Sequence, residues 1–182
     1  CSSDLLKRLD TLWLQVGGTL CNLECTHCFI SCSPKNDTIA MMTLSQVKER
    51  LKESEALGVK DYYITGGEVF INPEIFEILV AILSYGPLDV LTNGTQITAE
   101  KALRLRSIQD ASNYPLRFRV SMENFEEAAN DAIRGKKCIQ ESCCRNQESC
   151  PSRIFSDTYY HALLGNREGR RNGIEVYPVS KG

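Results

Sequence analysis

The sequence predicts an α/β fold in which parallel strands alternate with helices, as in an α/β barrel or part of one. Short apolar or β-branched segments alternate with longer segments of helical periodicity between residues 12 and 121. Repetition of strand and helix requires parallel strands joined by right-handed crossovers. Polar and glycine-containing motifs follow the strand-like segments, and functional residues of such barrels lie at the carboxyl ends of the strands.

The first predicted unit carries a long loop. Residues 12–16 are apolar and are followed by two glycines, which is typical of a short buried strand. The polar loop over residues 19–42 is longer than most connections in a compact domain, which indicates a functional role. A helix is expected over residues 43–57, because Thr43 and Gln46 form a capping box before an apolar repeat that ends at Gly58.

Three further strands and two further helices follow in the same order. The residues of these strands have β-forming composition, and the second strand ends at a pair of glycines. The helix after Pro73 has a broad apolar face and ends before Gly86-Pro87. The expected elements are strands over residues 61–65, 88–92 and 116–121, and helices that begin after Pro73 and at Thr98.

Three cysteines in the long loop indicate a metal centre. Cys21, Cys25 and Cys28 have the spacing C-x3-C-x2-C, and thiolates select zinc or iron–sulfur clusters. In a four-iron four-sulfur cluster, three thiolates leave one iron open to a small molecule. Cys32 could instead complete a closed four-thiolate zinc site, so a non-catalytic zinc or iron–sulfur protein remains an alternative.

The cysteine loop, followed by Gly66-Gly67-Glu68 after the second strand, resembles the radical SAM superfamily. The resemblance implies a partial six-unit (β/α) open barrel and a 4Fe-4S cluster held by Cys21, Cys25 and Cys28. It also implies that S-adenosyl-L-methionine binds the open iron and is reductively cleaved to start radical chemistry on an unknown substrate. An electron donor such as a flavodoxin or ferredoxin is the implied partner.

The resemblance also implies which residues bind S-adenosylmethionine, whereas it assigns no catalytic side chain. The implied cofactor-binding residues are His27 near the adenine, Gly66, Gly67 and Glu68 at the methionine part, and Asn93 and Ser121 at the ribose or methionine groups. Turn-forming roles remain open for the last two residues. The sequence Met122-Glu123-Asn124 stands where the family often has Asp-Gly after the serine, and Arg134 is interpretable as a surface cation.

Composition limits the compartment and the partners. The chain has 182 residues and a formal charge of −2, which gives no electrostatic case for nucleic acid. It lacks an apolar run of the roughly 18 residues that a membrane span requires. Nine cysteines without a disulfide-scaffold pattern favour a reducing compartment, so we expect a cytoplasmic protein that does not associate with membranes.

The expected organisation has a lead-in over residues 1–10, a core of four strand–helix units over residues 11–135 and an irregular tail over residues 136–182. The tail has no sustained helical or strand periodicity. If its reading frame is displaced by one nucleotide, permissible codons encode amino-acid sequences with helix-like and strand-like patterns. A frame error, a tail without a folded role and an auxiliary cluster on Cys138, Cys143, Cys144 and Cys150 are the three alternatives. We expect no regular fifth or sixth strand and an incomplete, inactive barrel fragment.

Overall fold

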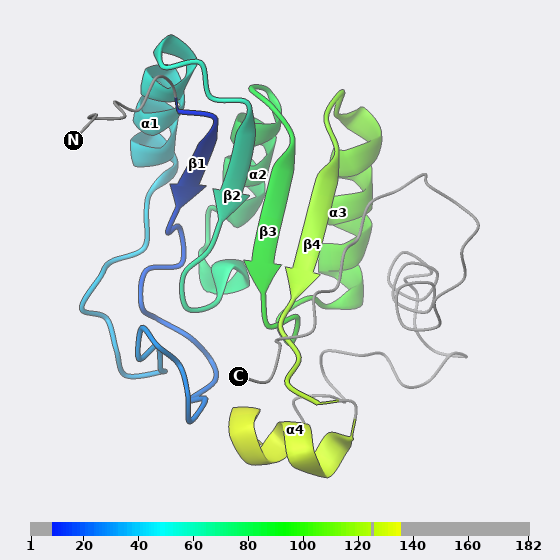
Figure 1. Cartoon of the computed structure of the whole chain (residues 1–182). Coiled ribbons are helices and arrows are strands. Elements are labelled where there is room, and N and C mark those ends of the chain that lie inside the picture. The colour runs from blue at the N-terminus through cyan, green and yellow to red at the C-terminus, as the bar shows by residue number, and fades with distance from the viewer. Residues whose placement is uncertain (1–8, 125, 136–182) are drawn as a thin grey trace, which may run out of the picture.

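A computed structural model describes residues 9–124 and 126–135. Its four strands form one sheet in the order β1-β2-β3-β4, and every neighbouring pair is parallel. The strands are β1 (Thr11–Leu14), β2 (Asp61–Ile64), β3 (Leu88–Thr92) and β4 (Leu116–Val120). The four adjacent parallel strands confirm the predicted α/β class (Figure 1). The prediction about fifth and sixth strands falls on residues 136–182, outside the described residues.

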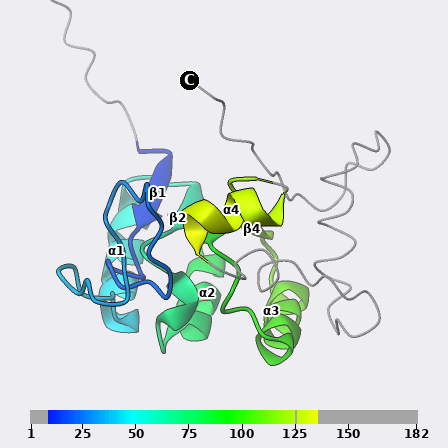
Figure 2. The same cartoon turned by 90° about the horizontal axis from the view of Figure 1, so that it is seen from below.

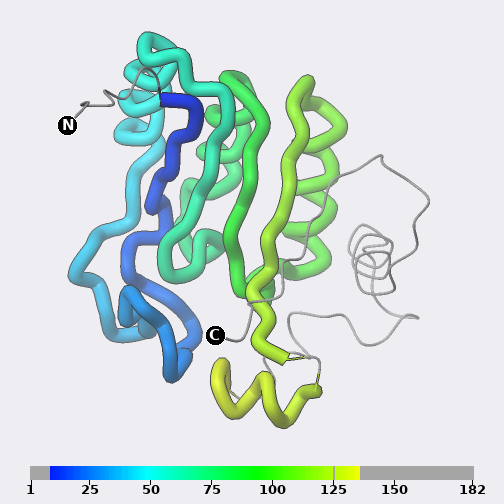
Figure 3. The backbone as a smooth tube through the Cα atoms, viewed as in Figure 1, coloured from blue at the N-terminus to red at the C-terminus, as the bar shows by residue number. Residues whose placement is uncertain are grey.

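Three helices cover one face of the sheet: α1 (Leu44–Ala56), α2 (Ile75–Leu83) and α3 (Ala99–Ala111) (Figures 1 and 3). Alternate strand residues pack against them and form the core, including Leu14, Ile64, Val90 and Phe118. The capping box at Thr43 is present as predicted, and Thr98 caps α3. A 3-10 turn, η1 (Val69–Ile71), precedes α2. None of the described helices is long and apolar enough to cross a membrane.

A fourth helix, α4 (Glu127–Arg134), was absent from the sequence prediction. Its buried residues are Asn130 and Arg134, both polar, and its eight residues are fewer than the roughly 11–18 over which helical periodicity is assessed. The helix lies across the carboxyl end of the sheet, below the strands in Figure 1 and in front of them in Figure 2. It therefore packs through polar contacts at the end of the sheet where functional residues were expected.

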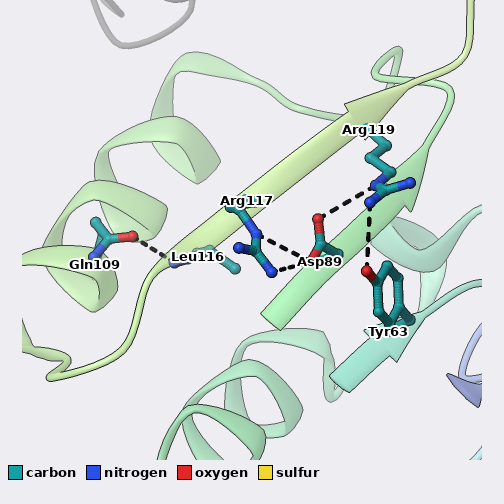
Figure 4. A network of polar contacts seen from close by, with 6 residues as sticks. All are labelled: Tyr63, Asp89, Gln109, Leu116, Arg117 and Arg119. Carbon is teal, nitrogen blue, oxygen red and sulfur yellow. Dashed lines mark hydrogen bonds and ion pairs between the residues drawn. The ribbon is translucent and has the colours of Figure 1, made fainter. Parts of the chain in front are cut away.

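The sheet face opposite the three helices carries a charged network (Figure 4). Asp89 is 3% exposed and accepts hydrogen bonds from Nε of Arg117 (3.0 Å) and Nε of Arg119 (3.3 Å). Arg119 also donates to the Tyr63 hydroxyl (3.4 Å), and Tyr63 stacks on Trp13 at 4.4 Å. The bond to Asp89 raises the pKa of Arg117. The two arginines provide the pairing that a buried carboxylate needs. Because the network has members on β1, β2, β3 and β4, it connects all four strands.

Candidate cluster and cofactor site

The cysteine loop is closed on itself at its base and is held to α4 near its tip. At its base, Leu20 forms a parallel β-bridge with Ser33, whose carbonyl also accepts from the backbone N–H of Cys21 (3.1 Å). Near its tip, the backbone N–H of Thr26 donates to the Ile133 carbonyl in α4 (3.0 Å). The loop therefore lies beside the ends of the strands, on the same side as α4 (Figures 1 and 2).

The four loop cysteines form one group of thiols. Cys21 and Cys32 are buried, whereas Cys25 and Cys28 are partly exposed, and none of these four cysteines forms a disulfide. Burial raises the pKa of Cys32 to about 12, with further contributions from Cys28, Cys21 and Cys25. Burial also raises the pKa of Cys21. The predicted ligands Cys21, Cys25 and Cys28 thus lie together, with Cys32 among them.

Several N–H groups point at the sulfur atoms. The backbone N–H of Leu23 donates to Cys21 Sγ (3.4 Å), and that of Cys32 donates to Cys28 Sγ (3.3 Å). Nδ2 of Asn93 donates to Cys21 Sγ over 3.7 Å. Hydrogen bonds to ligand sulfurs stabilise the anionic thiolates of an iron–sulfur cluster and tune its potential. The donor set therefore fits a cluster held by thiolates.

A single zinc ion and a cubane cluster make different demands on the thiolates that hold them. Among residues 9–124 and 126–135, no three His, Cys, Asp or Glu side chains converge on one metal-ion position. A structural zinc ion would need four ligands around one centre, with Zn–S distances of about 2.3 Å. A cubane cluster places each thiolate on a separate iron, so it does not require convergence on one point.

Gly66 and Gly67 lie against the stem of the cysteine loop. A Cβ on Gly66 would lie 2.6 Å from Gly17 Cα, and the φ of Gly66 is +140°. A Cβ on Gly67 would overlap the Leu20 carbonyl and lie 3.0 Å from Cys21 Cβ. Real Cβ atoms do not approach other atoms so closely, so only glycine allows this contact between the two segments. These glycines position the first predicted cluster ligand.

Glu68 connects the ends of β2 and β3. Its side chain is fully buried, and Oε1 accepts from the Phe70 backbone N–H (3.0 Å) and the Thr92 hydroxyl (2.7 Å). Oε2 accepts from the Asn93 backbone N–H (2.8 Å). Burial raises the pKa of Glu68, whereas these three hydrogen bonds lower it. A carboxylate accepts about four hydrogen bonds, so the protein itself uses most of this capacity.

The other predicted cofactor residues surround the same end of the sheet. Asn93 is buried, and its Nδ2 donates to Asn22 Oδ1 in the cysteine loop (3.0 Å). Ser121 follows β4, and its backbone N–H donates to the Thr92 carbonyl (3.0 Å). The side chain of His27 is 56% exposed, and its Nε2 lies 3.3 Å from Oε2 of Glu123. Asn93 thus contacts the cysteine loop directly. Ser121 lies at the end of β4, and His27 lies in the cysteine loop itself.

Glu123 joins the cysteine loop to α4. Besides its contact with His27, its Oε1 pairs with Nη1 of Arg134 at 3.0 Å. Asn130, which is 1% exposed, accepts from the Glu123 backbone N–H (3.0 Å). Arg134 is 7% exposed, so its interpretation as a surface cation is wrong. Sequence reasoning missed Glu123 and Asn130, because the turn that pairs them and the contact of Glu123 with His27 depend on the tertiary fold.

Replacing Arg134 by alanine is expected to loosen the tip of the cysteine loop. Loss of the buried ion pair leaves Glu123 without its cationic partner, and α4 also supplies the carbonyl that accepts from Thr26. Hydrogen exchange of the peptide containing Thr26 should become at least tenfold faster, which corresponds to about 1.4 kcal/mol. Arg50→Ala, which removes an exposed ion pair in α1, is the control and should leave this exchange unchanged.

The sequence profile of the Radical SAM superfamily matches residues 16–143. The chain belongs to the radical SAM superfamily. The match includes the cysteine loop, the Gly66-Gly67-Glu68 turn and the ends of the following two strands, so the resemblance seen in the sequence is confirmed. Members of this superfamily use a 4Fe-4S cluster and S-adenosylmethionine, which agrees with the donor set around the thiols.

Curated members of the superfamily share this part of the chain. The mycofactocin maturase MftC of Mycobacterium tuberculosis is 35% identical over 116 residues, which are 63% of this chain and 28% of the maturase. The subtilosin biosynthesis protein AlbA of Bacillus subtilis is 29% identical over 126 residues, which are 69% of this chain and 27% of AlbA. The chain therefore spans about a quarter of the length of these relatives.

Solved radical SAM structures have the same fold. Streptococcus suis SuiB bound to S-adenosylmethionine superposes with a TM-score of 0.60 at 19% identity, over 85% of this chain and 32% of SuiB. A structure of anSMEcpe with bound AdoMet and a Cp18Cys peptide gives a TM-score of 0.57 at 19% identity, over 72% of this chain and 37% of that protein. These similarities confirm the predicted radical SAM fold class.

Proposed function

We propose that this chain is the catalytic core of a radical SAM enzyme that reductively cleaves S-adenosylmethionine. The observation that carries the proposal is the group of motif thiols at the carboxyl end of the sheet, with the Asn93 amide directed at Cys21. When bound, the cluster supplies one electron to the sulfonium, which breaks a carbon–sulfur bond and starts hydrogen abstraction from a substrate.

The residues of this chain bind and orient the two cofactors. Cys21, Cys25 and Cys28 are the proposed cluster ligands. The backbone of Gly66 and Gly67 holds the turn against the loop stem, where it faces the methionine part of the bound cofactor. The remaining proposed contacts to S-adenosylmethionine come from His27, Glu68, Asn93 and Ser121. For Glu68, the three hydrogen bonds within the protein favour a role in positioning the turn, with one acceptor site left for an ammonium.

A peptide is the substrate class that the relatives favour. SuiB has been crystallised with the precursor peptide SuiA, and anSMEcpe with the peptide Cp18Cys. MftC is named a maturase, and AlbA a bacteriocin biosynthesis protein. A flavodoxin or ferredoxin is the proposed electron donor. The proposed compartment is the cytoplasm, because a thiolate-held cluster and nine cysteines require reducing conditions.

Anaerobic reconstitution tests the proposed reaction. The chain is supplied with iron and sulfide, reduced with dithionite and incubated with S-adenosylmethionine, and the products are separated by chromatography. A brown protein that forms 5′-deoxyadenosine and methionine supports the proposal and overturns the expectation from the sequence that the chain is an inactive fragment. Colourless protein that binds zinc tightly and forms neither product would instead identify the alternative, a non-catalytic metal-binding protein.

A further inference from the structure

Cys32 is not part of the three-cysteine motif, but its side chain lies among the thiols of the three motif cysteines. The side chain of Cys32 is 6% exposed, and its backbone N–H donates to Cys28 Sγ (3.3 Å). Cys21 and Cys25 are close enough to act on it electrostatically. A buried thiol with three cysteine neighbours differs from an isolated core cysteine, which packs among apolar groups.

The backbone explains why Cys32 faces the motif. The parallel bridge between Leu20 and Ser33 places Cys32 opposite Thr19. Side chains at opposite positions point to the same side, and residues two apart along an extended chain share that side. Cys32 therefore faces the same side as Cys21, and both are buried. The base of the loop brings the first motif ligand and the additional thiol together before any metal is bound.

The number of thiols suggests a role for Cys32. Three motif thiolates leave one iron of a 4Fe-4S cluster without a protein ligand, and thiolate is the ligand that iron in such clusters prefers. We propose that Cys32 ligates this fourth iron in the absence of S-adenosylmethionine and that binding of S-adenosylmethionine displaces it. This inference rests on the proposed function, because it requires the cluster on Cys21, Cys25 and Cys28.

The proposed exchange between Cys32 and S-adenosylmethionine at the fourth iron transfers a proton and replaces one iron ligand by another, and it transfers no electron. Cys32 releases its thiol proton to solvent when it binds iron, as metal ligation by cysteine requires. When S-adenosylmethionine takes the position, the thiolate leaves the iron and recovers a proton, and the oxidation state of the cluster is unchanged. Cys32 therefore competes with S-adenosylmethionine, and it protects the fourth iron from loss while the cofactor is absent.

Competition predicts that removing Cys32 strengthens cofactor binding. The 182-residue chain and its Cys32→Ser variant are reconstituted anaerobically and titrated with S-adenosylmethionine. The Kd of the variant should be at least threefold lower than that of the parent chain. A merely structural role of Cys32 would predict the opposite, since a damaged loop binds the cofactor more weakly. Cys32→Ala provides a second variant if the serine variant does not fold.

Oxidation provides a second readout without turnover. After ferricyanide treatment in the absence of S-adenosylmethionine, an iron that lacks a protein ligand is lost, and a three-iron cluster with its own electron paramagnetic resonance signal remains. This signal should be at least threefold larger in Cys32→Ser than in the parent chain. Both proteins are compared again in a background where the tail cysteines are replaced by serine, so that those thiols cannot act as substitute ligands. The tail cysteines are Cys138, Cys143, Cys144 and Cys150.

The outcomes separate this inference from the proposed function. Equal or weaker cofactor binding by Cys32→Ser, or an equal three-iron signal, overturns the role of Cys32, while cleavage of S-adenosylmethionine by both proteins keeps the proposed function. A parent chain that assembles no iron–sulfur cluster, or that binds zinc through the four thiols, overturns both. Tighter binding together with the larger signal supports Cys32 as the displaceable fourth ligand.

Discussion

Replacing Cys21, Cys25 or Cys28 by alanine is expected to abolish assembly of the 4Fe-4S cluster. The two remaining motif thiolates cannot hold the cluster, and Cys32, at the base of the loop beside Ser33, does not occupy the position of the missing motif ligand. Iron content after anaerobic reconstitution should fall from about four atoms per chain to fewer than about one. Formation of 5′-deoxyadenosine should fall below detection in all three variants.

The matched control is Cys32→Ala, which removes a thiol of the same group. This variant should retain about four irons under anaerobic conditions, because the three motif ligands suffice for assembly. A triplet variant that keeps its full iron content would contradict the ligand assignment. If Cys32→Ala instead lost its iron while one of the triplet variants kept it, Cys32 would be one of the three principal ligands.

The strands were predictable from sequence because each is marked locally. β3 was predicted with its observed bounds, β2 ends one residue before its predicted end, and β1 starts one residue earlier and ends two residues earlier than predicted. The capping box of α1 and the Thr98 cap of α3 are also local signals, formed by residues three apart. These elements agree with local propensity, so short-range patterns suffice to place them.

The contacts that build the site were less predictable, because they join distant segments. Neither the burial of Arg134 nor its pairing with Glu123 has a local signal. The glycines at 66 and 67 were expected to make room for a cofactor, whereas the structure also places them against Gly17 and Leu20. Glycine indicates that a close approach occurs, but the partner in that approach depends on the tertiary fold.

Glu68 shows the same difference between residue type and role. The motif predicted a contact with the ammonium of the cofactor, and the structure gives this carboxylate three donors within the protein, from Phe70, Thr92 and Asn93. Asn93 in turn donates to Cys21 Sγ. Contacts therefore connect Glu68, after the end of β2, through Asn93, after the end of β3, to Cys21 in the cysteine loop. Loss of Glu68 should affect both stability and the cluster.

Replacing Glu68 by alanine is expected to destabilise the cluster-free chain by about 2–6 kcal/mol, because two fixed backbone donors lose their buried acceptor at about 1–3 kcal/mol each. The N–H groups of Phe70 and Asn93 cannot turn toward water, whereas the Thr92 hydroxyl can rotate to another acceptor. Domains of this size are stable by only about 5–15 kcal/mol, so this single change is a large fraction of the total. Urea unfolding under reducing conditions measures the loss.

Two further variants distinguish the lost hydrogen bonds from the lost charge. Glu68→Gln keeps the shape of the side chain and one acceptor oxygen, so it should be less destabilising than Glu68→Ala. It should still destabilise the chain, because one N–H or O–H donor then faces the NH2 group of the glutamine amide in place of an acceptor. Glu55→Ala, at an exposed position of α1, should change the unfolding free energy by less than about 0.5 kcal/mol. If Glu68→Ala unfolded at the same urea concentration as Glu55→Ala, the three hydrogen bonds would not hold the strand ends together. The role of Glu68 would then be its proposed contact with S-adenosylmethionine.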